Sequence, residues 1–229
     1  MIRILKKILQ IALDQFNKWF FHLSIKQKNF CIFSNDCWGG ELYRRMQLPY
    51  NTPFIGLMLM APCYLKFLKN PHKYIEAKLE FTSESSYQLV NELRESAGLF
   101  PIGRLLDIEV HFLHYNSEEE ALEKWNRRRI RINWDNLYVK FTLDKDYATE
   151  DHLKDFDSLP YLRKICFSKT SYSDSKSCIK INNFVENGVF MFRACMKQFD
   201  IVGWINEGKL QFTGFNKLRG KLLYYSLFR

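Results

Sequence analysis

The sequence lacks the features that mark several common classes of protein. Its 229 residues contain no internal repeat, no low-complexity tract and no linker rich in proline or glycine. Charged residues interrupt the apolar segment at the amino terminus, so it does not supply the run of about 20 mostly apolar residues that a transmembrane helix needs. None of the six cysteines forms a CxxC pair, and no His/Cys cluster has zinc-finger spacing. These absences exclude repeat architectures, an amino-terminal membrane span and zinc fingers.

The cysteines and the amino terminus indicate a compartment. Asp14 and Lys18 break the apolar segment, and no small-residue cleavage site follows it, so we predict no signal peptide. We therefore expect a cytoplasmic protein with reduced thiols. The apolar runs around Cys31 and Cys166 predict that these two side chains pack in the core.

The formal net charge of +9 is unevenly distributed. Residues 1–30 hold six basic residues and one acidic residue, residues 205–229 hold five and one, and the segment between them is neutral. Because a nucleic-acid-binding protein carries its basic stripe on the folded body, we predict no nucleic-acid partner. Apolar residues make up 47% of the chain and charged residues 26%, which is enough to form a core.

The amino-terminal arm, residues 1–27, has an amphipathic pattern. On a helix at 100° per residue, one 120° arc is polar: Arg3, Lys6, Lys7, Gln10, Asp14, Asn17 and Lys18. The opposite side is apolar: Leu5, Ile8, Leu9, Ala12, Phe16, Trp19, Phe20 and Leu23. Gln15 and Phe21 are exceptions. This apolar face can lie on an anionic membrane surface, pack on the protein's own body, or contact a second subunit in an oligomer.

The rest of the chain, residues 28–229, predicts a single α/β domain. The periodicity predicts strands at residues 29–34, 54–60, 105–114, 137–142, 163–168 and 178–181, and helices at 38–46, 62–70, 117–129, 150–157 and 189–199. The alternation of strands and helices between residues 105 and 168 is typical of a mostly parallel or mixed sheet. The strand at 105–114 alternates polar and apolar residues, which favours the edge of the sheet. Ser117 and Glu120 predict a capping box for the following helix, and helix-end electrostatics explain the arginines at residues 127–131.

Polar residues follow four of the predicted strands, and ligands bind beyond the carboxyl ends of strands in open α/β sheets. If the strands are parallel, these residues share one rim and form a cleft. They comprise Ser34, Asn35, Asp36 and Cys37 after the first strand, His114, Tyr115 and Asn116, then Thr142, Asp144 and Asp146, and finally Ser168 and Lys169.

The motif SNDCWGG carries the most chemistry. Cys37 precedes a predicted helix, which can lower the pKa of a thiol, and it can act as a nucleophile with His114 as its base. Asn133 or Asp135 would orient the imidazole. The alternative is a glycine-rich turn in which Cys37 is a small buried residue.

The same motif also suits a sugar or sugar-phosphate ligand. Gly39 and Gly40 let a ligand approach the backbone, and free amide groups at the start of a helix attract anions. Asp144 and Asp146 can contact sugar hydroxyls or hold a divalent cation, or they can simply belong to a turn. No other cofactor is indicated. The remaining candidate binding residues are Ser34, Trp38, Tyr50, Asn51, Tyr115, Arg131, Asn133 and Asp135.

Three long motifs resemble one bacterial family. SNDCWGGELYRRMQLPYNTPF, APCYLKFLKNPHKYI and HYNSEEEALEKWNRRRIRIN are similar to the patterns of the family called domain of unknown function 1919. The resemblance covers about residues 28–200, and it implies a three-layer α/β/α sandwich. Many family members carry the label of exopolysaccharide biosynthesis, so the resemblance implies a role in capsule or lipopolysaccharide assembly. The family usually has asparagine where this chain has Asp36.

Three functional hypotheses follow. The first is a transferase acting on an activated or lipid-linked sugar at the inner face of the cytoplasmic membrane, with Asn35, Asp36, Gly39 and Gly40 holding the substrate. The second is a hydrolase or acyltransferase that depends on Cys37 and His114. The third is a non-catalytic glycan-binding or scaffold protein. A close approach of Cys37 to His114 in an open cleft favours the second.

Overall fold

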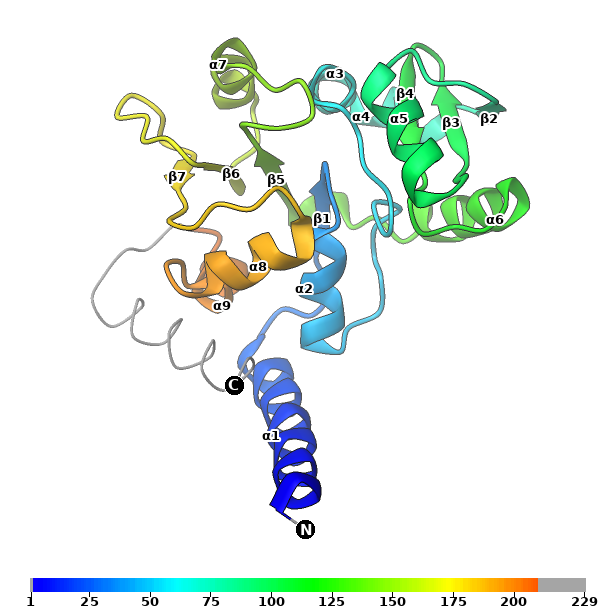
Figure 1. The fold of residues 1–229 in the computed structure, drawn as a ribbon. Helices are drawn as coiled ribbons and strands as arrows, with labels where there is room; N and C mark the ends of the chain where they lie inside the picture. The colour runs from blue at the N-terminus through cyan, green and yellow to red at the C-terminus, as the bar shows by residue number, and fades with distance from the viewer. Residues whose placement is uncertain (1, 210–229) are drawn as a thin grey trace.

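A computed structural model describes residues 2–209 of the chain. Its central element is a four-stranded sheet in which every neighbouring pair is parallel (Figure 1). The strand order is β1-β5-β6-β7. The strands are β1 (Cys31–Ser34), β5 (Leu137–Thr142), β6 (Lys164–Ser168) and β7 (Cys178–Lys180). Parallel strands need crossover connections, and the helix predicted at residues 150–157 forms the crossover from β5 to β6.

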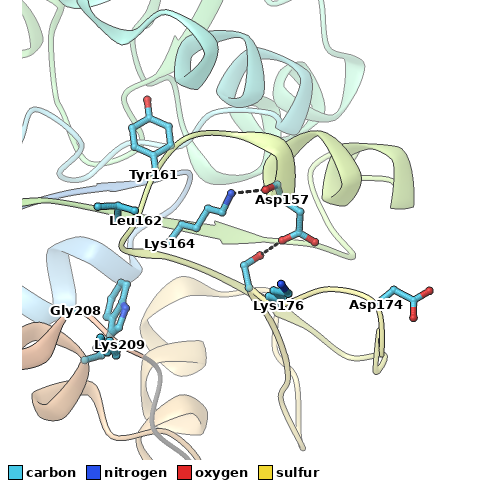
Figure 2. A pocket seen from close by; sticks show the side chains of 10 residues that line it. Asp157, Tyr161, Leu162, Lys164, Asp174, Lys176, Gly208 and Lys209 are labelled. Atoms are coloured by element: carbon cyan, nitrogen blue, oxygen red, sulfur yellow. Dashed lines mark hydrogen bonds between the residues drawn. The ribbon is translucent and has the colours of Figure 1, made fainter.

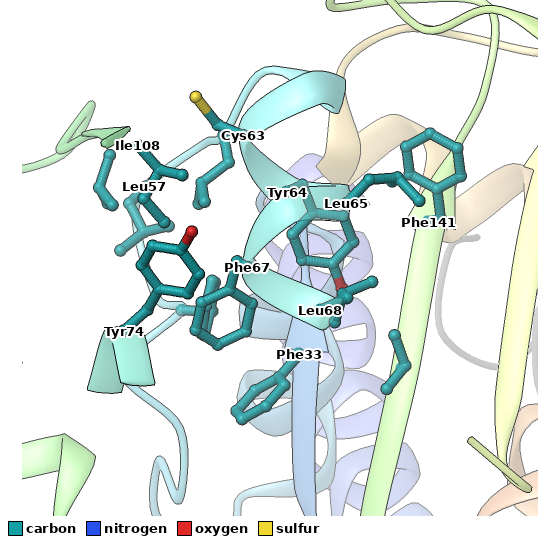
Figure 3. Packing of buried hydrophobic residues seen from close by; sticks show 14 of the residues in the cluster. Phe33, Leu57, Cys63, Tyr64, Leu65, Phe67, Leu68, Tyr74, Ile108 and Phe141 are labelled. Atoms are coloured by element: carbon teal, nitrogen blue, oxygen red, sulfur yellow. The ribbon is translucent and has the colours of Figure 1, made fainter. Parts of the chain in front are cut away.

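Helices cover both faces of this sheet, so the fold is the predicted α/β sandwich. One face packs against α3 (Ala61–Lys69), α4 (Pro71–Glu76), α6 (Glu118–Arg129) and α7 (Glu150–Ser158). The other packs against α2 (Trp38–Met46), α8 (Gly188–Met196) and α9 (Ile201–Glu207). Successive side chains of a strand point to opposite faces: Phe33 lies in the first core and Ile32 in the second. Figure 3 shows the first core, where Tyr64 and Phe67 of α3 pack over Phe33 and Phe141.

A second sheet differs from what the sequence predicts. It is antiparallel, with the order β2-β3-β4, and comprises β2 (Leu79–Thr82), β3 (Ile102–Leu105) and β4 (Ile108–His111), with α5 (Gln88–Ala97) beside it. The single strand predicted at residues 105–114 is therefore wrong. Leu106 has φ 56°, which turns the chain and makes a β3–β4 hairpin instead. The periodicity of 105–114 could not show this, because both sides of the turn alternate in the same way.

The strand predicted at residues 54–60 is also wrong. Within it only Met58 pairs with another strand, through an isolated bridge to His111. Gly56 has φ 70°, a conformation that interrupts an extended strand. The segment nevertheless connects the two sheets, since Met58 bonds His111 while Leu59 N donates to Asn35 O (3.0 Å).

Most other elements agree with the predicted boundaries. Helix α2 has the predicted bounds, and α6 starts where Ser117 Oγ accepts a hydrogen bond from Glu120 N (3.2 Å). The Glu120 carboxylate accepts from Asn116 N rather than Ser117 N, so the capping box is only half formed. The short η1 (Trp134–Asn136), α4, α5, β2 and α9 were not predicted.

The amino-terminal arm forms α1 (Ile2–Ser24), which projects from the body in Figure 1. Its last turn is fixed by Phe21 and Ile25, both buried in the second core. Asn206 of α9 ties the end of the helix through hydrogen bonds with Ser24 O and Lys26 N (2.8 Å each). In the described residues, no helix has the length and apolar character to cross a membrane.

Candidate active site

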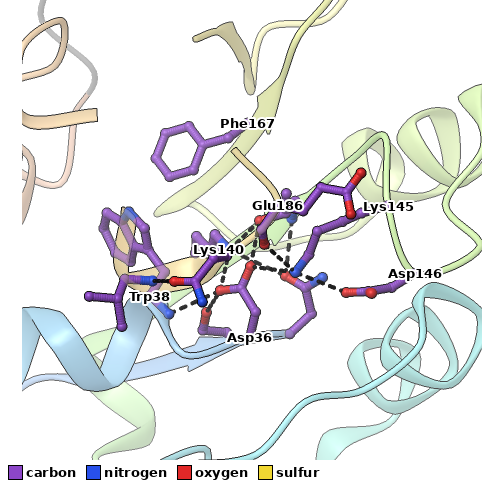
Figure 4. A network of polar contacts seen from close by, with 12 residues as sticks. Asp36, Trp38, Lys140, Lys145, Asp146, Phe167 and Glu186 are labelled. Atoms are coloured by element: carbon purple, nitrogen blue, oxygen red, sulfur yellow. Dashed lines mark hydrogen bonds and ion pairs between the residues drawn. The ribbon is translucent and has the colours of Figure 1, made fainter. Parts of the chain in front are cut away.

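The turn after β1 is built around a buried carboxylate. Asp36 is 3% exposed, and its Oδ1 accepts hydrogen bonds from Trp38 N (3.0 Å), Ser34 Oγ (3.3 Å) and Lys140 Nζ (2.6 Å). Its Oδ2 accepts from Thr142 Oγ1 (2.9 Å). A buried carboxylate must be paired or fully hydrogen-bonded, and Figure 4 shows this network around Asp36.

Two lysines set the electrostatics of this network. Lys140, which is fully buried on β5, and Lys145 (3.4 Å) both face Asp36. Burial raises the pKa of Asp36, but the two ammonium groups outweigh it and hold this pKa well below its usual range. Burial lowers the pKa of Lys140 despite the attraction of Asp36. Lys145 also pairs with Asp146 (3.1 Å). The cluster thus contains two carboxylates and two ammonium groups, whose charges neutralise one another.

Asp144 and Asp146 do not converge on one point. The Asp144 carboxylate accepts hydrogen bonds from Ser168 Oγ (2.6 Å) and Lys169 N (2.8 Å), which closes the loop after β6. Asp146 is engaged by Lys145. Across residues 2–209, no three His, Cys, Asp or Glu side chains are grouped so that they could hold a metal ion. The geometry therefore gives these aspartates a structural role, and a divalent cation there stays a prediction.

Cys37 occupies the position immediately before α2, half-buried at the carboxyl end of β1. The first backbone hydrogen bond of the helix runs from Glu41 N to Cys37 O (3.1 Å), so the N–H groups of Gly39 and Gly40 precede the helical ladder. Gly39 packs against Ser34, where an added Cβ would lie 3.0 Å from the serine Cβ. The glycines thus let the helix start close to the sheet, beside the thiol.

His114 reaches Cys37 from the second sheet. Its Nε2 lies 3.5 Å from Cys37 Sγ, and its ring is on the exposed side of the pair. The backbone N–H of His114 donates to Gly56 O (3.0 Å). An added Cβ on Gly56 would lie 3.2 Å from the His114 Cβ, so the loop at Gly56 packs directly against the histidine. The structure therefore brings together the two residues that the sequence predicts as nucleophile and base.

The surroundings of Cys37 raise the pKa of its thiol. Burial, and after it the Asp36 carboxylate, raise this pKa to about 11, because Lys145 and Lys140 offset them only in part. The sequence-based expectation of a lowered thiol pKa at the helix start is wrong, because burial of the thiol and the neighbouring Asp36 carboxylate raise this pKa. A nucleophilic role for Cys37 therefore requires a base in contact with it, and His114 is in that position.

Tyr115 and Arg128 hold the loop beside His114. The Tyr115 hydroxyl donates to Ile55 O (2.5 Å) and accepts from Arg128 Nη1 (2.6 Å). The Arg128 guanidinium also lies over the Tyr50 ring, 5.2 Å from its centroid. Arg128 lies in the last turn of α6, as helix-end electrostatics predicts, but it is also only 8% exposed and supports the candidate site.

The other predicted site residues lie elsewhere. Asn133 Nδ2 donates to Asn29 O (2.8 Å) and Asn51 Nδ2 to Asn29 Oδ1 (3.4 Å), both near the amino end of β1. Arg131 and Asp135 are exposed, and they too precede β5. Because Cys37 follows the carboxyl end of β1, this group lies at the opposite edge of the sheet. The expectation that Asn133 or Asp135 orients His114 is wrong.

Ser34, Asn35, Asp36 and Trp38 are buried, at 0–3% exposed. The side chains of Ser34 and Asp36 bond to each other, and those of Asn35 and Asp36 bond to the neighbouring strand, as in the contact of Asn35 Oδ1 with Thr142 N (3.0 Å). They support the turn that presents Cys37 and Gly40, and their direct contact with a substrate stays a prediction.

A cavity of about 440 Å³ lies away from this pair (Figure 2). It is lined by residues such as Lys164 at the amino end of β6 and Trp204 of α9. The Lys164 ammonium donates to three carbonyls at the end of α7, including Asp157 O (2.5 Å) and Leu159 O (2.6 Å). Its charge is thus used within the fold, and the cavity offers no partner to Cys37.

A second buried polar cluster was not predicted. Glu109 Oε2 accepts from Ser85 Oγ (2.5 Å) and contacts His111 Nε2 (3.2 Å), while Glu109 Oε1 accepts from Ser86 N (2.9 Å). Burial raises the pKa of Glu109, but these hydrogen bonds outweigh it and lower the pKa to about 2. Ser85 and His111 are both buried, so this arrangement fixes the loop before α5 rather than presenting a nucleophile. In the sequence, the alternation of the polar residues Glu109 and His111 with apolar residues was the pattern that could have indicated this cluster.

The comparisons with known proteins agree with the motifs. The family model "Domain of unknown function (DUF1919)" matches residues 8–206. The chain belongs to this family. An uncharacterised protein of Haemophilus influenzae is 31% identical over 210 residues, and the alignment covers 86% of this chain and 95% of the relative. The match starts at residue 8, so it includes most of α1, whereas the motifs alone placed the arm outside the resemblance.

Proposed function

We propose that this DUF1919 protein catalyses thiol-dependent acyl transfer or ester hydrolysis, with Cys37 as nucleophile and His114 as general base. The observation that carries the proposal is the 3.5 Å distance between Cys37 Sγ and His114 Nε2. A nucleophile within reach of a base is the signature of covalent catalysis, and contacts of this kind are often loose before substrate binds.

The chemistry follows from the two side chains. His114 Nε2 takes the thiol proton as Sγ attacks the carbonyl carbon of the acyl donor, and a C–S bond forms. The tetrahedral adduct collapses when the leaving oxygen departs with the proton that His114 returns. Water or an acceptor hydroxyl then attacks the thioester and gives its proton to His114, which returns it to Sγ as the C–S bond breaks. Each proton and bond is accounted for by these two residues and the acceptor.

The start of α2 supplies the complementary electrostatics. Backbone N–H groups that point at a developing oxyanion stabilise the transition state strongly. Gly40 is half-buried beside Cys37, and its N–H precedes the first backbone hydrogen bond of α2. The half-buried Tyr50 packs against Arg128 and Tyr43. Given the polysaccharide pathway that the family resemblance implies, we place the substrate among acyl esters of carbohydrates.

Sugar transfer from an activated donor is supported less well. That reading assigned substrate contacts to Asn35 and Asp36, which are buried, and to Asp144 and Asp146, which are engaged separately by Ser168 and Lys145. Acyl transfer requires only Cys37 and His114, whose Sγ and Nε2 atoms lie 3.5 Å apart.

The test is acylation by a generic activated ester, p-nitrophenyl acetate, followed by intact-mass analysis and by release of p-nitrophenol. We expect one acetyl group on Cys37, lost in Cys37→Ala. In His114→Ala the acylation rate should fall about 10²- to 10⁴-fold. Cys178→Ser is the matched control, because Cys178 is the other half-buried cysteine in the chain and lies on β7. Equal acylation of wild type and His114→Ala would refute the proposed function.

A further inference from the structure

The apolar face of α1 has no partner in the described part of the protein. Ile4, Leu5, Ile8, Leu9, Ile11, Phe16, Trp19, Phe20 and Leu23 are between 47% and 65% exposed. They account for half of the exposed large hydrophobic residues within residues 2–209, gathered on a single helix. Contiguous apolar surface of this kind marks an interaction site.

Phe21 shows how the helix is oriented. It is the apolar residue that breaks the amphipathic pattern, since at 100° per residue it falls within the polar arc. It is also fully buried, and together with Ile25 it joins α1 to the body. The helix is therefore attached by the polar side of its last turn, and its apolar face points away from the protein. Packing of this face on the body formed by residues 28–209, one of the sequence-based alternatives, is excluded.

Three partners remain for the apolar face of α1: a second copy of the chain, residues 210–229 of the same chain, and a membrane surface. Their charges distinguish them. Residues 1–30 carry six basic residues and one acidic residue, and residues 210–229 carry four basic residues and no acidic one. A second copy of α1, or the carboxyl-terminal segment of the same chain, would bring positive charge against positive charge. An anionic lipid surface attracts both segments and accepts the aromatic rings of Phe16, Trp19 and Phe20 at the level of the headgroups.

We propose that α1 is a membrane-docking helix, which lies in the interface of an anionic bilayer with the face of Leu5, Leu9, Phe16 and Trp19 in the lipid. The inference is independent of the chemistry of Cys37. It requires no spanning helix, and the fixed attachment through Phe21 and Asn206 would hold the body at the membrane surface.

The test is flotation of the full chain with vesicles of phosphatidylcholine alone or with about one third phosphatidylglycerol. We expect binding that depends on phosphatidylglycerol, weakens with salt, and falls at least tenfold in the double variant Leu9→Glu/Phe16→Glu. The matched control is Leu99→Glu/Leu162→Glu, which places the same charges at leucines that are 80% and 96% exposed elsewhere. This control should bind like the wild type.

Three results would overturn the inference. The first is no flotation with either vesicle. The second is equal binding by the α1 variant and the wild type. The third is a dimer in analytical ultracentrifugation that the α1 variant alone converts to a monomer, because that would assign the face to a second copy. Far-UV circular dichroism establishes that each variant folds, so loss of binding is not loss of structure.

Discussion

Replacing Lys140 by methionine should destabilise the protein by about 3 kcal/mol. The Lys140 side chain is 0% exposed and its ammonium lies 2.6 Å from Asp36 Oδ1, so the substitution removes the main counter-ion of a buried carboxylate. Breaking one side of a buried ion pair costs about 3–5 kcal/mol. We expect the lower end, because Lys145 remains 3.4 Å from Asp36 Oδ2.

Urea unfolding followed by tryptophan fluorescence measures this effect. With a slope of about 2–3 kcal/mol per molar urea, the midpoint should fall by about 1 M. Lys154→Met is the matched control: it removes the same ammonium from an ion pair with Asp151 whose side chains are 76% and 87% exposed. An exposed pair of this kind contributes little to stability, because solvent screens it. The double variant Lys140→Met/Asp36→Asn should recover part of the loss, since no uncompensated charge remains.

The pH dependence of stability tests the ion pair of Lys140 and Asp36 in a second way. The pKa of Asp36 in the folded protein lies below its unfolded value, so its contribution to stability is present above the unfolded pKa and is lost as pH falls. The difference between wild type and Lys140→Met should therefore be largest near neutral pH and shrink on acidification. A difference below about 0.5 kcal/mol at neutral pH, or one that grows in acid, would show that Lys140 does not stabilise the Asp36 carboxylate.

Three further predictions concern other contacts. Asp36→Asn should lower the pKa of the Cys37 thiol, because the carboxylate raises it, and the pH profile of iodoacetamide alkylation should shift to lower pH; an unchanged profile would contradict this. Glu109 contributes stability above its unfolded pKa near 4.5, which is lost as pH falls toward about 2, so Glu109→Gln should destabilise the protein at neutral pH and flatten its acid unfolding curve. Gly188→Ala should cost about 1–3 kcal/mol, because the new Cβ would lie 2.8 Å from Trp38 N and 3.0 Å from Cys37 N, whereas Gly40→Ala meets only Ile55 at 3.7 Å and should be mild in thermal unfolding.

The sequence was informative where a local pattern decides the structure. The apolar run ending at Ser34, the helix of residues 38–46 and the Ser117 cap follow from neighbouring residues, and the structure has them. The second sheet depends on pairing between residues 79 and 111, and the periodicity of one segment carries no information about such partners. A charged residue in a buried strand could have been noticed: Lys140 interrupts LYVKFT, and a lysine there requires an acidic partner.

The approach of Cys37 to His114 was predicted from an arrangement that does not exist. The sequence pattern predicted both residues at the carboxyl end of one parallel sheet, whereas His114 follows the edge strand of an antiparallel sheet. Residues 54–59 produce the proximity instead, because Met58 pairs with His111 and Leu59 bonds Asn35, the second residue before Cys37. The loop thus sets the distance between the two sheets, and Gly56 sets how closely His114 approaches.

The charges around Cys37 also bear on the kind of chemistry that it can perform. Redox cysteines react as thiolates, and they are found where a helix start or a cation lowers their pKa. Here burial and the Asp36 carboxylate together raise the pKa of the thiol to about 11. A thiol of this kind resists oxidation and reacts only when a base removes its proton during the attack. The single base that the fold brings to it is His114, at 3.5 Å among the described residues. The network of Asp36 and its lysines therefore favours a nucleophile that is activated by its histidine over one that is permanently ionised.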